Sequence, residues 1–135
     1  MLDTSVCIEL SEGNPDVAAA LRSFKTRDLG VSTIAVMELE QGHQLGQHKK
    51  LNRARIDAFL ANIRVVDFDR RAAQQAARVF AGYERRGRRP PFFDALIAAH
   101  ALSLGVRVAY HDGDFHALPE KSRLFITKRS AQLRQ

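Results

Sequence analysis

Four acidic side chains stand at positions from which they could act on one ligand: Asp3, Glu38, Asp94 and Asp112. If three or four carboxylates converge within roughly 6 Å, each pair repels by about 3 kcal/mol at an effective dielectric of 20, and a divalent cation removes that cost. Oxygen ligands without a cysteine cluster or a histidine pair favour Mg²⁺, or Mn²⁺ in its place, over Zn²⁺. Because Mg²⁺ also accepts phosphate oxygens, such a site points to phosphoester hydrolysis.

Asp94 is the most informative of these acids. Two phenylalanines precede it and an apolar run follows, so the sequence predicts a carboxylate in buried, apolar surroundings. A buried carboxylate needs a partner. The structural alternative is a first-turn acid that the helix dipole favours after two prolines.

The other acids also have structural alternatives. Asp3 ends a short apolar run and precedes a helical pattern, so it could serve only as a helix N-cap. Glu38 lies in a helical pattern where a solvated edge position is the alternative, and Glu40 competes with it as the inward-facing acid. The residue pattern alone leaves both glutamates open.

Asp112 follows a β-branched run and belongs to the segment His111-Asp112-Gly113-Asp114-Phe115. Asp-Gly is a common hairpin signal, but the residues that follow lack strand alternation and contain Pro119. We therefore expect a loop and a short helix after a parallel strand, with Asp112, Asp114 or both facing the metal.

Two histidines and the single cysteine are expected to be structural. His100 and His111 lie on apolar segments, where a histidine is more often a satisfied structural residue than a ligand. Cys7 has apolar neighbours and no clear histidine partner beside it, which indicates a buried thiol.

Short β-branched runs alternate with longer helical patterns, which favours an α/β fold with a mainly parallel sheet. A three-layer α/β/α sandwich and a single domain over residues 1–135 follow. Acids at the carboxyl ends of the strands should share one rim of such a sheet. The expected strands are 30–33, 64–68, 106–110 and 124–127, with the end of another at 1–3, and the expected helices are 15–25, 34–45, 51–63, 69–86 and a buried one at 93–104.

The formal charge is +6 and the isoelectric point is near 10.1, which suits a polyanionic partner. The densest basic cluster is Arg85, Arg86, Arg88 and Arg89, a candidate RNA-binding surface whose alternative is a solvated helix end. No apolar stretch approaches 18 residues and no signal peptide is evident, so we expect a cytoplasmic protein without a membrane span.

The sequence resembles the PIN-domain ribonucleases, and in particular the VapC toxins of type II toxin-antitoxin pairs. Four segments carry the resemblance over almost the whole chain: Leu2-Asp3-Thr4-Ser5, the run from Met37 to Gly42, the run from Phe93 to Ala101, and Asp112-Gly113-Asp114-Phe115. The residues before Asp3 are fewer than usual in the family, and the Pro-Phe-Phe before Asp94 replaces a more common polar or Gly-Pro sequence.

The resemblance implies that Asp3, Glu38, Asp94 and Asp112 bind the metal, with Asp114 as a supplementary ligand and Thr4 or Ser5 orienting a carboxylate or a metal-bound water. It selects Glu38 over Glu40. It also implies an Mg²⁺-dependent endoribonuclease that cleaves tRNA or rRNA, inhibits translation, pairs with a VapB-like antitoxin and forms a homodimer.

Two other functions compete with this one. The Asp-x-Asp spacing of Asp112 and Asp114 is found in phosphatases of the haloacid dehalogenase type, although here it lies unusually late in the chain. A nucleic-acid-binding module without catalysis would use the basic cluster and leave Asp94 unexplained.

Overall fold

The structure is a computed structural model that describes residues 1–48, 50–111, 115 and 118–126. Helices and short strands alternate along the chain, as expected for an α/β fold. The helices are α1 (Thr4–Ser11), α2 (Pro15–Leu21), α3 (Thr33–Gln44), α4 (Arg53–Ala61), α5 (Arg70–Arg85) and α6 (Phe92–Leu104), with 3-10 turns η1 (Thr26–Asp28) and η2 (Glu120–Ser122). The strands are β1 (Gly30–Ser32), β2 (Arg64–Val66), β3 (Val108–Tyr110) and β4 (Arg123–Phe125).

The strands pair in parallel, as the alternating pattern predicts. β1 pairs with β2 and β3 with β4. Leu2 lies between the two pairs and forms parallel bridges to Val31 and to Ala109. The order across the parallel segments is therefore β2, β1, Leu2, β3, β4. The expected strand at residues 1–3 is reduced to this one bridging residue.

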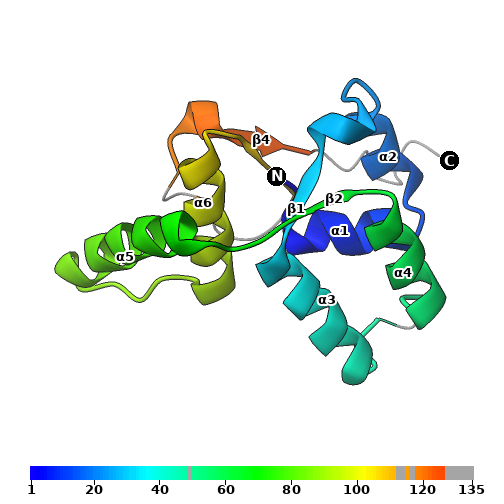
Figure 1. The fold of residues 1–135 in the computed structure, drawn as a ribbon, viewed down its shortest axis with the longest axis horizontal. Coiled ribbons are helices and arrows are strands. Elements are labelled where there is room, and N and C mark those ends of the chain that lie inside the picture. The colour runs from blue at the N-terminus through cyan, green and yellow to red at the C-terminus, as the bar shows by residue number, and fades with distance from the viewer. Residues whose placement is uncertain (49, 112–114, 116–117, 127–135) are drawn as a thin grey trace, which may run out of the picture.

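The predicted elements are present, with shorter bounds at several ends. The helix expected to reach residue 25 ends at Leu21, and the strand expected from residue 106 starts at Val108. In Figure 1, α5 and α6 lie on one side of the parallel segments and α1, α3 and α4 on the other. That arrangement agrees with an α/β/α sandwich, although the three layers stay a prediction.

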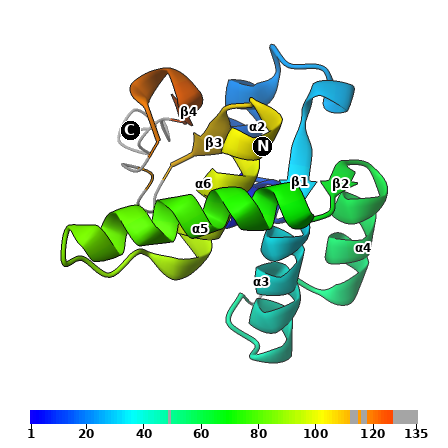
Figure 2. The ribbon, with the colours of Figure 1, turned by 60° about the vertical axis from the view of Figure 1, so that its left-hand side comes forward.

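Helix α6 is the central buried helix that its apolar sequence predicts. Its C-cap is Gly105, whose φ of 66° is the left-handed conformation that glycine adopts without strain. Helix α5 packs along α6, and its C-terminal end projects from the rest of the molecule (Figures 1 and 2). The buried residues of α6 are Ala95, Ile97, Ala98, Ala99, His100 and Ala101.

Two parallel segments pass directly into helices at one rim. The segment containing Leu2 enters α1 through Asp3, and β1 enters α3 through Ser32, whose hydroxyl accepts a hydrogen bond from the backbone N–H of Ile34. These N-caps place the first turns of α1 and α3 beside each other at the carboxyl ends of neighbouring segments. Among the described residues, no helix combines the length and the apolar character needed to cross a membrane.

Candidate metal centre

Asp3 is both a helix cap and a buried carboxylate. Its Oδ1 accepts a hydrogen bond from the backbone N–H of Val6 at 3.0 Å, and its Oδ2 accepts one from the Ser5 hydroxyl at 2.9 Å. The residue is only 2% exposed. The capping alternative is therefore confirmed, and it holds the carboxylate in a fixed orientation at the rim.

Glu38 reaches back from α3 to the start of α1. Its Oε1 accepts a hydrogen bond from the Thr4 hydroxyl at 2.6 Å. Burial raises the pKa of Glu38, and the neighbouring Asp94 carboxylate raises it further, while the Thr4 hydrogen bond acts in the opposite direction. Glu38 is thus half-buried in a setting that disfavours its own negative charge.

Asp94 lies in the first turn of α6, where the helix dipole favours an acid. The prediction that it is buried was wrong, because Asp94 is partly exposed. The reason is its place on the helix: α6 is covered in its middle, whereas its first turn lies at the rim and leaves Phe92 57% exposed. The Asp94 carboxylate is nevertheless close enough to Glu38 to disfavour its ionisation.

The charges of Asp3, Glu38 and Asp94 influence the pKa values of groups in one part of the molecule. Burial raises the pKa of the Cys7 thiol well above its usual range, and the charges of Asp3 and Glu38 raise it further. Asp94 acts in turn on Glu38. Carboxylates from the start of α1, the middle of α3 and the start of α6 therefore share one electrostatic neighbourhood.

The donor chemistry of this neighbourhood fits Mg²⁺. Within the ranges that the structure describes, no three His, Cys, Asp or Glu side chains form a group that could hold a metal ion by themselves. Mg²⁺ often takes only one or two carboxylates directly and keeps several waters, so a few oxygen donors are enough. Burial raises the pKa of Glu38 most and the Asp94 carboxylate raises it further, and a cation would offset the negative charge of the two carboxylates. Asp112 and Asp114 lie outside the described residues.

The two hydroxyls next to Asp3 serve different carboxylates. Thr4 donates to Glu38 across 34 positions of sequence, whereas Ser5 donates to Asp3 within the same turn. Each hydrogen bond fixes the orientation of one acid, as outer partners do around metal ligands. The chain position of Thr4 gives no hint of its long-range partner.

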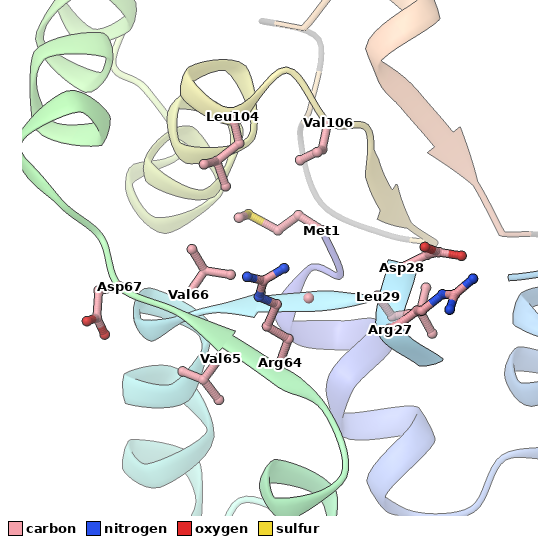
Figure 3. Close-up of a pocket in the computed structure, with 11 residues that line it drawn as sticks. Met1, Arg27, Asp28, Leu29, Arg64, Val65, Val66, Asp67, Leu104 and Val106 are labelled. Atoms are coloured by element: carbon pink, nitrogen blue, oxygen red, sulfur yellow. The ribbon is translucent and has the colours of Figure 1, made fainter. Parts of the chain in front are cut away.

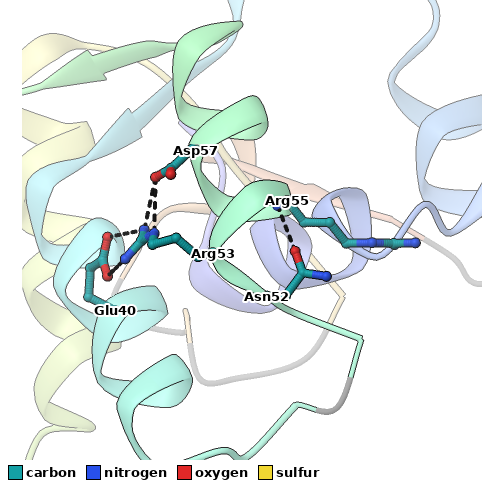
Figure 4. Close-up of polar contacts among 5 residues, drawn as sticks. All are labelled: Glu40, Asn52, Arg53, Arg55 and Asp57. Atoms are coloured by element: carbon teal, nitrogen blue, oxygen red, sulfur yellow. Dashed lines mark hydrogen bonds and ion pairs between the residues drawn. The ribbon is translucent and has the colours of Figure 1, made fainter.

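Glu40 has a different environment from Glu38, although it is only two residues away. Both of its carboxylate oxygens accept hydrogen bonds from the Arg53 guanidinium, each at 2.7 Å (Figure 4). Arg53 also contacts Asp57 at 3.1 Å. The Arg53 guanidinium lowers the pKa of Glu40 and ties α3 to α4. Sequence reasoning missed Arg53, which no short-range pattern connects to Glu40.

His100 and Cys7 are buried, as expected of structural residues. His100 Nδ1 lies 2.9 Å from the hydroxyl of Ser32, and the ring packs edge-on against Phe68. Burial lowers the pKa of His100, which favours the neutral ring. The side chain of His111 is 4% exposed, and its Nε2 lies 4.0 Å from Glu9.

The predicted basic cluster is exposed. Arg85 ends α5, and Arg86, Arg88 and Arg89 follow it on the connection to α6. Arg86 lies over the ring of Tyr83 at 5.2 Å, which holds that guanidinium near the helix end. Exposure is what a phosphate-binding surface needs, and RNA binding by this cluster stays a prediction.

A cavity of about 440 Å³ lies elsewhere, near the amino ends of the parallel segments (Figure 3). Met1, Gly30, Arg64 and Val106 are among its lining residues. Asp3, Glu38 and Asp94 do not line it. The candidate metal centre is therefore separate from this cavity, and two of its three described acids, Glu38 and Asp94, are partly exposed.

Comparisons with known proteins agree with this geometry. The family model of the PIN domain matches residues 1–121. A relative from Shigella flexneri, named tRNA(fMet)-specific endonuclease VapC, is 33% identical over 106 residues, which cover 78% of this chain and 80% of that protein. The chain therefore belongs to the PIN domain family, and its resemblance to the VapC-type toxins within that family is confirmed.

Two solved structures share the fold. A chain in the structure of DNA-bound VapBC from Salmonella typhimurium is 30% identical to this chain, with a TM-score of 0.70. The match covers 82% of this chain and 84% of that one. FitAcB from Neisseria gonorrhoeae is 29% identical with a TM-score of 0.67, covering 86% of this chain and 90% of that one. The α/β fold of the PIN family is thus present over most of the chain.

Proposed function

We propose that this chain is the endoribonuclease toxin of a toxin-antitoxin pair and that it hydrolyses RNA phosphodiesters with Mg²⁺, which Mn²⁺ can replace. The observation that carries the proposal is the approach of Glu38 to Asp94 beside the hydroxyl-oriented Asp3, with ionisation of Glu38 disfavoured. Acids so placed form a cation site, and a phosphodiester would reach it from the side on which Glu38 and Asp94 are partly exposed.

Each described acid has a role in this proposal. Asp3 and Glu38 enter the site already oriented by Ser5 and Thr4, and Asp94 supplies charge from the first turn of α6. Asp112 and Asp114 are proposed to complete the ligand set from the segment after β3. When bound, Mg²⁺ would neutralise the phosphate and lower the pKa of a water molecule that attacks it. No nucleophile from the protein is required.

The substrate and partners are proposed from the relatives. One relative is named for a tRNA endonuclease, so tRNA is the first substrate to test and rRNA the second. Solved relatives are VapBC complexes, which supports a VapB-like antitoxin as a partner of this chain. We further propose a homodimer and a continuous parallel sheet between two helical layers.

The test is to map the 5′ ends of cellular RNA after brief expression of the wild type and of Asp94→Asn. Asparagine keeps the shape of the side chain and removes the charge on which the cation depends. We expect discrete cuts with the wild type and none with Asp94→Asn. Asp57→Asn, a change of the same chemistry at an exposed acid on α4, should cut like the wild type.

Purified protein separates the metal requirement from effects in cells. Cleavage should need Mg²⁺ or Mn²⁺ and stop when a chelator is added. Undiminished cleavage in chelator would contradict the metal mechanism. Equal cleavage by the wild type and Asp94→Asn would place the active site elsewhere.

A further inference from the structure

Helix α5 carries arginines along one exposed face, beyond the cluster at its C-terminal end. Arg71, Arg78 and Arg85 are spaced by seven residues, which is close to two helical turns, and all three are exposed. At 1.5 Å per residue, the fourteen positions from Arg71 to Arg85 span about 21 Å. The opposite face packs inward through Ala72, Ala76 and other residues.

The far end of this face forms a hollow of about 340 Å³ between α5 and α6. Its lining is polar, with two guanidinium groups and two amides on the α5 side. The Arg78 Nη1 donates a hydrogen bond to Gln75 Oε1 at 3.0 Å, which orients one guanidinium toward the face. The lining residues are Arg71, Gln74, Gln75 and Arg78 from α5 and Leu102 and Ser103 from α6.

Among the residues that the structure describes, no carboxylate neutralises these arginines. In the described part of the chain, no ion pair involves Arg71, Arg78 or Arg85. Helix α5 contains four arginines and one acidic residue, Glu84. Guanidinium groups with this exposure and charge are suited to phosphate groups, which they bind through paired N–H donors.

The C-terminal half of α5 packs against the start of α6, because the ring centroids of Phe80 and Phe92 lie 5.5 Å apart, and the end of α5 at Arg85 projects beyond that contact. Arg85 leads into the short connection that carries Arg86, Arg88 and Arg89, and α6 then begins two residues before Asp94. The hollow at Ser103 is nine residues, or about 13 Å, further along α6. A polyanion on this face would therefore run from the hollow toward the start of α6, which carries Asp94.

From this geometry we infer that the exposed face of α5 is a track for the sugar-phosphate backbone of the RNA substrate, with a phosphate-binding groove at Arg71 and Arg78. This inference rests on the proposed function. It adds that the enzyme holds an RNA that extends well beyond the bond it cuts. A second copy of the chain is a poorer occupant, because a symmetric contact through this face would oppose the two sets of arginines.

The test measures RNA binding in the cleavage-deficient Asp94→Asn protein, so that the probe stays intact. Fluorescence anisotropy would follow unfractionated tRNA and a short single-stranded oligonucleotide at several salt concentrations. Arg71→Gln with Arg78→Gln should weaken tRNA binding about fivefold at moderate salt. It should also lower the salt slope by about 1.5, since each lost phosphate contact removes roughly 0.7–0.9. The loss should be smaller for the short oligonucleotide.

The matched control is Arg22→Gln with Arg27→Gln, which removes the same charge from exposed positions around the end of α2. That pair should leave both the affinity and the salt slope as they are. An unchanged slope for the α5 variant, or an equal loss in the control, would overturn the inference. Self-association that the α5 variant abolishes would instead assign the face to a second copy and overturn it as well.

Failure of the proposed function would look different. If protein with Asp94 intact did not cleave RNA under any metal condition, the nuclease assignment would fall, whatever the binding data. If the wild type cleaved RNA while the α5 variant kept full affinity and slope, only the track would be wrong.

Discussion

Glu38 and Glu40 lie two residues apart on α3, yet their surroundings shift their pKa values in opposite directions. Two positions on a helix point about 200° apart, so the two side chains meet different neighbours. Glu40 accepts both hydrogen bonds of a guanidinium, which lowers its pKa. Glu38 is half-buried beside Asp94, and its pKa is raised. One acid is neutralised by the protein, and the other is held in a setting that a cation would improve.

This contrast separates a structural acid from a candidate functional one without reference to family patterns. An ion pair at the surface ties two helices and contributes little to stability. A carboxylate placed near another carboxylate destabilises the metal-free protein, and that cost is typical of sites shaped for a ligand. The same contrast holds for the arginines, since Arg53 is paired with carboxylates, whereas the arginines of α5 form no ion pair with any described residue.

The largest expected effect is on RNA cleavage, when the charge of Glu38 or of Glu40 is removed one at a time. Glu38→Gln should reduce RNA cleavage by at least about a hundredfold, equivalent to about 2.7 kcal/mol of transition-state stabilisation. Glu40→Gln makes the same chemical change on the same helix and should retain activity near that of the wild type. The measurement is kcat/KM with Mg²⁺ on one RNA substrate. Equal losses of RNA cleavage in the two variants would contradict the distinction between a functional Glu38 and a structural Glu40.

A smaller effect is expected from the hydroxyl that orients Glu38. Thr4→Val removes the donor at 2.6 Å and nearly keeps the side-chain shape, and it should cost about tenfold in activity, as outer partners of metal ligands do. Thr4→Ser should restore most of it. Ser11→Ala is the control, since the Ser11 hydroxyl donates to the backbone of Cys7 within the same helix. Full activity in Thr4→Val would mean that the hydrogen bond does not position Glu38.

The smallest effects concern the pH dependence of stability in metal-free protein, and here the two glutamates have opposite signs. The raised pKa of Glu38 means that its stabilising contribution is present at acid pH and is lost as the pH rises through the folded-state pKa. Glu38→Gln should therefore raise the Tm at pH 7 by roughly 1–3 °C, allowing for solvent screening. This gain should vanish below the ordinary pKa of 4.5.

The lowered pKa of Glu40 gives the reverse behaviour. Its stabilising contribution is present above the ordinary pKa of 4.5 and is lost as the pH falls through the lower folded-state pKa. Glu40→Gln should slightly lower the Tm at pH 7, and the difference should shrink at acid pH. Thermal unfolding at pH 7 and pH 4 measures both variants together. A fall in Tm for Glu38→Gln at pH 7 would contradict the assigned environment.

The sequence predicted the order and type of the elements well because apolar periodicity and β-branched runs are local signals. The strands predicted at residues 30–33 and 106–110 are present as β1 and β3, within those ranges. It failed on Asp94, whose apolar neighbours in sequence suggested burial although the first turn of α6 lies at the rim. The family resemblance, and no local pattern, selected Glu38 over Glu40.

Long-range partners explain most of what the sequence did not show. Thr4 and Glu38 are 34 positions apart, and Arg53 reaches Glu40 from another helix. Nothing in the spacing of these residues fixes such contacts, because they depend on how α1, α3 and α4 pack. The arginines of α5 are different: their spacing of seven residues is visible in the sequence, but their lack of ion pairs among the described residues is a property of the folded chain.

The most direct test of the central claim is calorimetric titration of Mg²⁺ into the wild type, Glu38→Gln and Glu40→Gln, without RNA. If Glu38 faces a cation site with Asp3 and Asp94, the wild type and Glu40→Gln should bind Mg²⁺ with similar affinity, and Glu38→Gln should bind at least about tenfold more weakly. Equal Mg²⁺ affinity in all three proteins would contradict the claim that Glu38 belongs to the metal centre.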